Sequence, residues 1–160
     1  EAGMTEITLA PMTRELFHTL YRGFENDPDI YMNMQYYTQY VYNSEKVDER
    51  FDSLQPPECV VFAVMLDGAP IGEVQLKRIN RERNDCTLSI HLQNDAVKNR
   101  GFGTQAEKQA VRYAFDVLKL DAVNADAVLK NTRSQHVLEK AGFMFTREDE
   151  MFRYYRIENE

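Results

Sequence analysis

The chain has 160 residues, 43% of them hydrophobic and 28% charged, with a formal net charge of −7. Its size and balance predict one globular domain over residues 1–160 with a buried core. The acidic balance argues against nucleic-acid binding, which needs clustered Lys and Arg, and no apolar run reaches the roughly 18 residues of a membrane span.

The N-terminus and the cysteines indicate the compartment. The N-terminus lacks the basic-then-apolar layout of a secretion signal. Residues 1–3 precede Met4, so we expect these three to be an artificial extension and Met4 the natural start. Cys59 and Cys86 lie far apart and belong to no metal-ligand spacing, which predicts reduced interior thiols, no metal site and a cytoplasmic protein.

The first half of the chain predicts a short strand, two helices and an antiparallel meander. Apolar residues at helical spacing follow Thr13, a good N-cap, and the Asp67-Gly68 pair joins a run rich in Val and Phe to the next strand as in a hairpin. In order, we expect a strand at 6–10, a helix from 13 that ends before 26, a helix at 46–54, and strands at 59–66, 70–79 and 86–92.

Residues 31–42 are rich in tyrosine and methionine and carry few charges. One interpretation is a flap that packs on the core. The other is the rim of a substrate site, because Tyr and Met present adaptable apolar faces.

The second half changes character. Apolar residues at helical spacing predict a buried helical stripe of Phe102, Ala106, Ala110, Ala114 and Val117. The expected elements are a helix at 103–118, a strand at 122–129, a helix at 132–141 closed by a C′ glycine at 142, and strands at 143–147 and 151–157. The order predicts an α+β domain, a mixed and mostly antiparallel central sheet flanked by helices.

The segment Lys98-Asn99-Arg100-Gly101-Phe102-Gly103-Thr104 lies between a predicted strand and a long helix. Its glycines let the backbone approach a ligand, and the N–H groups entering the helix favour an anion such as pyrophosphate. The segment also fits a dinucleotide-binding fingerprint, but that motif follows the first strand of a parallel unit, whereas an antiparallel meander precedes it here.

A second segment opens with Asn131-Thr132-Arg133-Ser134 and ends with Ala141-Gly142-Phe143. Together with residues 98–104, it resembles the two sequence blocks of the GNAT N-acetyltransferases, in the branch of the ribosomal-protein and spermidine acetyltransferases. The resemblance covers residues 59–157 well and the N-terminal part loosely. Lys98 stands where the family prefers Gln or Arg.

The resemblance implies a site for acetyl-CoA, and no metal. The end of the strand at 86–92 would pair its backbone with the pantetheine arm, and residues 97–104 would cradle the pyrophosphate. Asn131 would contact the pantetheine or thioester region, cap its helix, or do both. The implied cofactor-binding residues are Ile90, His91, Leu92, Val97, Lys98, Asn99, Arg100, Gly101, Phe102, Gly103, Thr104, Asn131 and Ser134.

The catalytic candidates are Ser134, Tyr154, Glu73 and His91. Several family members carry a Tyr where this chain has Leu138, which cannot donate a proton. The candidate acid is therefore Ser134 or one of the neighbouring Tyr154 and Tyr155, of which at most one can face the site. Each also has a structural interpretation, Ser134 as a capping residue. Glu73 and His91 are candidate bases, and a water relay without a dedicated base is the alternative.

The expected function is acetyl transfer from acetyl-CoA to a primary amine on a protein N-terminus, a polyamine or a small molecule, by direct attack in a ternary complex. The alternative is a non-catalytic module that senses acetyl-CoA or binds a partner. The acceptor amine is the expected partner, without nucleic acid or membrane, and a second copy in a homodimer is the further candidate.

Overall fold

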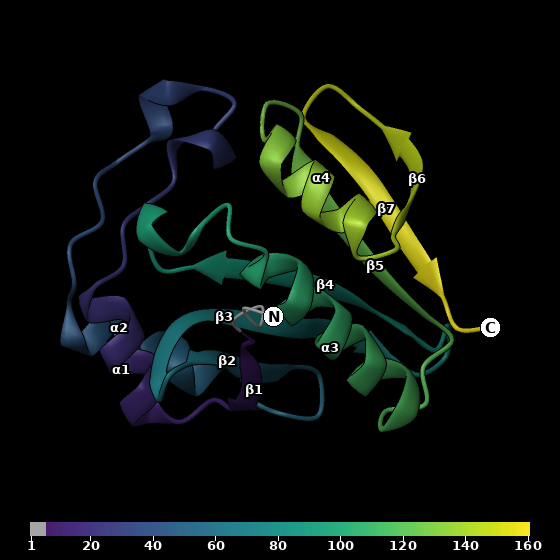
Figure 1. Ribbon diagram of the computed structural model, residues 1–160, viewed down its shortest axis with the longest axis horizontal. Helices are drawn as coiled ribbons and strands as arrows, with labels where there is room; N and C mark the ends of the chain where they lie inside the picture. The colour runs from purple at the N-terminus through teal and green to yellow at the C-terminus, as the bar shows by residue number, and fades with distance from the viewer. Residues whose placement is uncertain (1–5) are drawn as a thin grey trace, which may run out of the picture.

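The computed structural model describes residues 6–160, so residues 1–3 and Met4, where we expect an extension and the natural start, lie outside the described residues. Seven strands form one sheet in the order β1-β2-β3-β4-β5-β7-β6, which confirms the predicted α+β class (Figure 1). The strands are β1 Thr8–Pro11, β2 Val60–Leu66, β3 Ala69–Asn80, β4 Asp85–Leu92, β5 Ala122–Val128, β6 Met144–Glu148 and β7 Phe152–Glu158. The helices are α1 Arg14–Arg22, α2 Ser44–Ser53, α3 Phe102–Asp116 and α4 Thr132–Lys140, with short 3₁₀ turns η1 Pro28–Ile30, η2 Met34–Tyr36 and η3 Asp95–Val97.

Local signals placed the ends of most elements correctly. The Thr13 side chain accepts a hydrogen bond from the Leu16 backbone N–H and begins α1 as predicted. Gly142 has φ +104° and its N–H donates to the Glu139 carbonyl, so it ends α4 as the predicted C′ residue. Helix α1 ends at Arg22, with Gly23 as its C-cap residue, and so before residue 26 as predicted.

The sheet opens between β4 and β5. These two strands are parallel and pair only over three positions, Asp85–Thr87 against Ala122–Asn124, while every other neighbouring pair is antiparallel. Residues 88–92 therefore have β3 on one side and no β5 ladder on the other. Backbone groups at such an edge remain free to bind an extended ligand.

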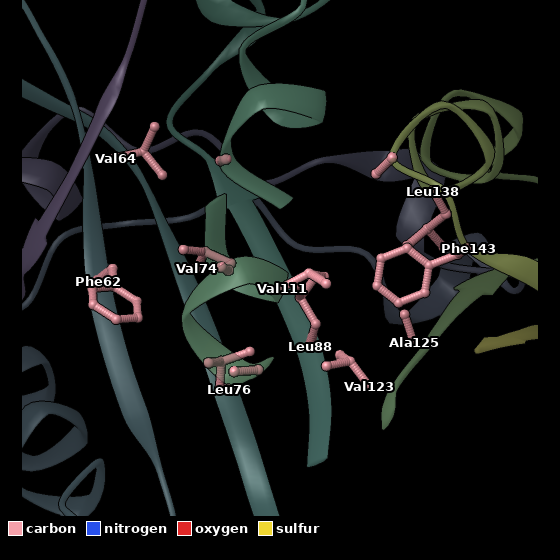
Figure 2. Close-up of a cluster of buried hydrophobic side chains, with 14 of the residues drawn as sticks. Phe62, Val64, Val74, Leu76, Leu88, Val111, Val123, Ala125, Leu138 and Phe143 are labelled. Carbon is pink, nitrogen blue, oxygen red and sulfur yellow. The ribbon is translucent and has the colours of Figure 1, made fainter. Parts of the chain in front are cut away.

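The two faces of the sheet carry different cores. Helices α3 and α4 cover one face, where Val74, Leu76 and Leu88 of β3 and β4 pack with Val111 and Leu138 of the helices (Figure 2). Helices α1 and α2 form a second cluster around Phe17, Leu20, Tyr21 and Val47. Alternate residues of β3 and β4 thus point to different helix pairs.

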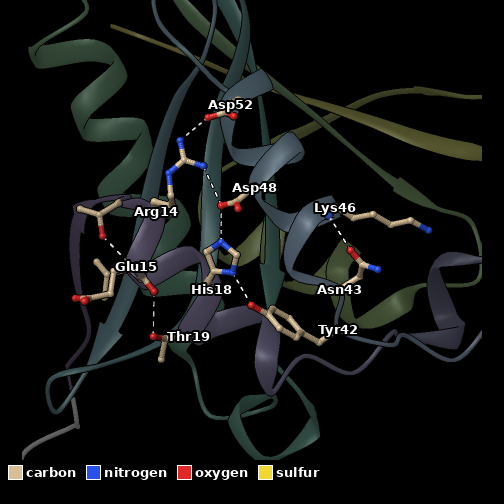
Figure 3. A network of polar contacts seen from close by, with 11 residues as sticks. Arg14, Glu15, His18, Thr19, Tyr42, Asn43, Lys46, Asp48 and Asp52 are labelled. Carbon is tan, nitrogen blue, oxygen red and sulfur yellow. Dashed lines mark hydrogen bonds and ion pairs between the residues drawn. The ribbon is translucent and has the colours of Figure 1, made fainter.

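A polar network joins α1 to α2 and to the segment just before α2. Asp48 of α2 accepts hydrogen bonds from Arg14 at 2.9 Å and from His18 at 2.7 Å, and the other nitrogen of His18 lies 2.6 Å from the Tyr42 hydroxyl (Figure 3). Asn43 caps α2 by accepting from the Lys46 N–H. The network anchors the end of the tyrosine-rich segment.

Part of the tyrosine-rich segment packs on the core, as one of its two interpretations predicted, while its role as the rim of a substrate site stays a prediction. Tyr40 packs on Tyr21 and Phe24, with ring centroids 5.9 and 5.2 Å apart, so part of the segment belongs to the α1–α2 cluster. Tyr36 and Met34 are 67% and 50% exposed.

Within residues 6–160, no helix is long and apolar enough to cross a membrane.

Candidate functional site

A cleft of about 390 Å³ lies at the open end of β4 and collects residues from both sides of the sheet. Helices α1 and α2 and the segment after α1 supply one wall, and the starts of α3 and α4 supply the other. Its lining residues are Phe17, Tyr21, Phe24, Glu25, Asn26, Asp27, Ile30, Tyr40, Lys46, Val47, Arg50, Ile90, His91, Leu92, Lys98, Gly103, Glu107, Asn131, Arg133, Ser134 and Val137.

The loop before α3 has the backbone geometry of an anion cradle. Gly101, at the N-cap, has φ +83°, which favours glycine, and Asn99 has φ +61°. No side chain caps α3, so its first-turn N–H groups, with the positive end of the helix dipole, are available to an anion. A Cβ added at Gly103 would meet Val137 at 3.4 Å, so little room remains there for a larger side chain.

Two cations lie beside this loop. Lys98 is mostly buried and pairs with Asp27 and Asp95, each at 3.3 Å. Arg133, from the first turn of α4, donates to the Asn99 side chain at 3.2 Å and lies 3.7 Å from Asp27. Sequence reasoning missed Arg133, because only the packing of α4 beside the loop brings it to the cleft.

Seven of the predicted cofactor residues line the cleft, and six do not. The seven are Ile90, His91, Leu92, Lys98, Gly103, Asn131 and Ser134. The six outside the lining are Val97, Asn99, Arg100, Gly101, Phe102 and Thr104. The Phe102 ring is 2% exposed and belongs to the core, and Arg100 turns back over that ring and donates to the Ala96 carbonyl. At these two positions, only the backbone remains for the predicted contact.

Asn131 caps α4 in the way the sequence indicated. Its side-chain oxygen accepts a hydrogen bond from the Ser134 N–H at 3.1 Å. Both residues also line the cleft. The cap is confirmed, whereas a contact of either residue with a ligand stays a prediction.

Glu73 lies beneath the cleft rather than in its wall. It is fully buried, and its carboxylate accepts hydrogen bonds from Tyr21, from Arg50 at 2.9 Å and from Gln75 at 2.8 Å. Burial alone would raise the pKa of Glu73, but the charge of Arg50 and these donors outweigh it and hold the pKa below its usual value. A carboxylate so well satisfied is a weak base and a strong anchor for Arg50 and Tyr21.

His91 stands directly opposite Glu73 in the β3–β4 ladder and lines the cleft. Its ring makes an edge-on contact with Phe24, with centroids 6.5 Å apart. Burial lowers the pKa of His91 below 6.5, against the opposing pull of Glu73. The imidazole is therefore neutral at pH 7 and able to accept a proton.

The candidate acids differ in their position. Ser134 lines the cleft, whereas Tyr154 does not and donates instead to Asp149 at 2.8 Å. Tyr155 is buried in the core and contacts Glu139 at 3.3 Å, so the two tyrosines point to opposite faces as expected for neighbours on a strand. Leu138 is 2% exposed and also belongs to the core.

Glu107 is a cleft residue that sequence reasoning missed. It lies on α3, one turn after Gly103, and is 1% exposed. Its Oε1 atom is buried without a hydrogen-bond partner among the described residues. Burial raises the pKa of Glu107 to about 8. An unsatisfied buried polar group costs about 1–3 kcal/mol in proteins, so this carboxyl calls for an explanation.

A sheet that opens between its fourth and fifth strands, beside an uncapped helix start, defines the class of acyl-CoA N-acyltransferase folds. Residues 6–144 match the Acetyltransferase (GNAT) domain family, and the chain belongs to that family. The predicted resemblance is confirmed.

Individual relatives support the same assignment. Probable N-acetyltransferase YjcK of Bacillus subtilis (strain 168) is 32% identical over 101 residues, which cover 62% of this chain. The match spans 56% of that relative's own length, little more than half.

Solved structures share the fold at low identity. The spermidine N-acetyltransferase of Vibrio cholerae in complex with CoA and spermine gives a TM-score of 0.76 at 17% identity, over 96% of this chain and 95% of that one. The aminoglycoside acetyltransferase AAC(6')-Ib in complex with coenzyme A gives 0.77 at 19% identity, over 96% and 95%. At such identities the likeness shows the fold alone.

Proposed function

We propose that this chain transfers an acetyl group from acetyl-CoA to a primary amine. The observation that carries the proposal is the cleft itself, where the unpaired edge of β4 at 88–92 meets the uncapped start of α3. The first feature suits the amide groups of a pantetheine arm and the second suits a pyrophosphate. The family to which the chain belongs supports acetyl-CoA as the donor.

The acid–base chemistry is proposed from the cleft residues. Acetyl-CoA supplies an activated acyl group, and a free alkylamine, with a pKa of about 10.4, must lose its proton before or during attack. Neutral His91 is the group placed to take that proton, with Glu73 behind it as an anchor. The β4 backbone N–H groups on the open side are donors for the oxygen that develops negative charge. Ser134 is a hydrogen-bond donor on the opposite wall.

The acceptor is proposed by class only. Among the similar structures, one is a spermidine N-acetyltransferase in complex with CoA and spermine, and another is an aminoglycoside acetyltransferase. Spermine and aminoglycosides both carry primary amines. On the acceptor side the cleft is lined by the aromatic rings of Phe24 and Tyr40 and by the acidic Glu25, which suits a cationic amine. The free thiols Cys59 and Cys86 support a cytoplasmic location.

Thermal melting with ligands and a coupled CoA-release assay test the proposal. Acetyl-CoA and CoA should raise the melting temperature, by a stabilisation of RT ln(1 + [L]/Kd), and NAD should not. A panel of polyamines, aminoglycosides and peptide N-termini should contain at least one amine that drives CoA release. The His91→Gln variant should lose about 10²-fold or more in kcat.

The outcomes separate the candidate functions. No shift with CoA at saturating concentration would refute the proposal. A shift with CoA but no turnover with any amine would instead favour the binding-only module. A His91→Gln variant with the wild-type rate would remove His91 from the chemistry and leave a water relay.

A further inference from the structure

One buried acid has no place in the chemistry described so far. Glu107 occupies the buried stripe of α3 between Gly103 and Val111, where an apolar residue would pack without cost. It nevertheless lines the cleft, and its Oε1 atom finds no partner among the described residues. A carboxyl kept unsatisfied at the wall of a ligand cleft indicates that a ligand completes its hydrogen bonding.

Three of the four Lys and Arg residues that line the cleft have their charged groups engaged elsewhere. Lys98 pairs with Asp27, Arg133 donates to Asn99 and Arg50 pairs with Glu73. The other titratable groups that line the cleft are Tyr21, Glu25, Tyr40, Lys46 and His91. The pKa of Glu107 rises to about 8 through burial alone, with no contribution from any of these charges. The carboxyl is thus mainly protonated at neutral pH and carries an O–H donor.

The position of Glu107 relates it to the donor molecule. It lies one helical turn beyond Gly103, on the same α3 face that meets Val137 and Leu92. A ligand held by its pyrophosphate at the start of α3 and extended along the open edge of β4 passes this point. Glu107 therefore lies on the donor side of the cleft, while His91 lies on the side of α1 and α2.

We propose that Glu107 is the acid of the transfer, contacting the thioester sulfur and protonating it as it leaves. The inference rests on the proposed function. The amine nitrogen forms a bond to the carbonyl carbon, and the carbon–sulfur bond breaks with its electron pair on sulfur. Sulfur takes the proton of Glu107, and His91 takes the proton of the amine. His91 then releases its proton to water in the cleft and Glu107 regains one from that water, so both residues return to their starting states with no net change in protons. The products are the acetylated amine and CoA as a thiol.

Two substitutions and a control test the role. Glu107→Gln keeps the size and a hydrogen-bond donor but has no proton to give, and Glu107→Leu removes the polar group. We expect Glu107→Gln to lower kcat about 10–100-fold with little change in the KM for acetyl-CoA. Loss of a general acid typically lowers the rate by about 10²–10⁴-fold. The loss expected here lies at or below the low end of that range, because a thiol with a pKa of about 8.5 partly leaves unaided. Asp116→Asn, which removes an exposed carboxylate from the same helix, should keep the wild-type rate.

A binding measurement tests the contact without turnover. Calorimetry should show that the wild type binds CoA more tightly than desulfo-CoA, and that Glu107→Leu loses this preference. In protein labelled with carbon-13 at the glutamate carboxyls, the NMR signal of Glu107 is the one that is lost in Glu107→Gln. CoA should change the chemical shift of that signal more than desulfo-CoA does.

A wild-type kcat in Glu107→Gln, or equal effects of CoA and desulfo-CoA on that signal, would overturn the assignment. If the wild type binds CoA and acetylates an amine, either of these two results leaves the proposed function intact. A wild type that does not bind CoA would instead refute the proposed function.

Discussion

Glu73 and Glu107 are buried on opposite sides of the sheet. They are equally buried but differ in their hydrogen-bond partners and in the direction of their pKa shifts. Glu73 is 0% exposed and Glu107 is 1% exposed. Glu73 has Arg50, Tyr21 and Gln75 as donors, and its pKa lies below the usual value. Glu107 has an oxygen without a partner, and its pKa rises to about 8. The comparison shows that partners, rather than burial, decide which buried carboxyl is charged.

The same contrast holds for the two helix starts that face the cleft. Asn131 caps α4, whereas no side chain caps α3 at Gly101. Glu73, beneath the cleft, and the start of α4 thus have their partners without a ligand. The α3 side is incomplete at both Glu107 and the helix start, and under the proposed function acetyl-CoA would supply the missing partners.

The largest expected effect is on the pH dependence of stability at Glu107. The folded pKa of about 8 lies above the usual 4.5, so the folded state holds the proton more strongly than the unfolded state. The wild type should therefore lose stability relative to Glu107→Gln as pH rises from about 4.5 to 8, by about 1.4 kcal/mol per pH unit and about 3–5 kcal/mol in total. Urea unfolding of both proteins at several pH values measures this difference.

Other titrating groups do not disturb that measurement. Glu73 has a lowered pKa, so its stabilisation is present above about pH 4.5 and is lost only in more acidic solution. The pKa of His91 is also lowered, so stability falls as pH drops below 6.5, equally in both proteins. A difference between the two proteins that stays constant from pH 5 to 8 would contradict the assigned state of Glu107.

The second prediction concerns the cation that pairs with Glu73. Without Arg50, Glu73 would lack a full set of partners, as Glu107 does. Arg50→Leu leaves a buried carboxylate without its cation and should lower the free energy of unfolding by about 2–3 kcal/mol. Breaking a buried pair typically costs about 3–5 kcal/mol, and the Arg50 side chain is 39% exposed, so water softens the loss. The double variant with Glu73→Gln should recover part of that cost. A single variant within about 0.5 kcal/mol of the wild type, by urea unfolding at pH 7, would show that the pair is unimportant.

The sequence predicted the order of elements because the signals for them are local. The Thr13 cap, the Asp67-Gly68 turn and the Gly142 C′ residue each act within a few residues. The loop at 98–104 was found for the same reason, since its function depends on backbone conformation. The wrong detail in α3 is also local: Val117 was expected in the buried stripe but is 58% exposed, because α3 ends at Asp116.

The partners of the two glutamates were beyond sequence reasoning. Glu73 lies 23 residues from Arg50 and 52 from Tyr21, and only the packing of α1 and α2 on the sheet brings them together. Glu107 was overlooked because the predicted α3 stripe follows one narrow row of apolar residues. The helix buries a wider face, including Gly103, Glu107 and Val111, since it contacts strands of the sheet on one side and α4 on the other.

The smallest expected effect separates capping from ligand binding at the two asparagine caps. Asn131 caps α4 at the cleft, and Asn43 caps α2 with the same type of bond, in which its Oδ1 accepts from the Lys46 N–H at 2.9 Å. Replacing either residue with Ala should lower the free energy of unfolding by about 1 kcal/mol, because each removes one cap. Under the proposed function, only Asn131→Ala should also weaken CoA binding, since Asn43 does not line the cleft. Urea midpoints at unchanged m-value measure the first quantity, and calorimetry with CoA measures the second.

Asn131→Asp should keep the cap but place a negative charge beside the ligand's phosphates and thioester, so it should restore stability without restoring affinity. If Asn131→Ala binds CoA as tightly as Asn43→Ala does, Asn131 serves α4 alone, and the backbone of β4 and the start of α3 hold the ligand without it.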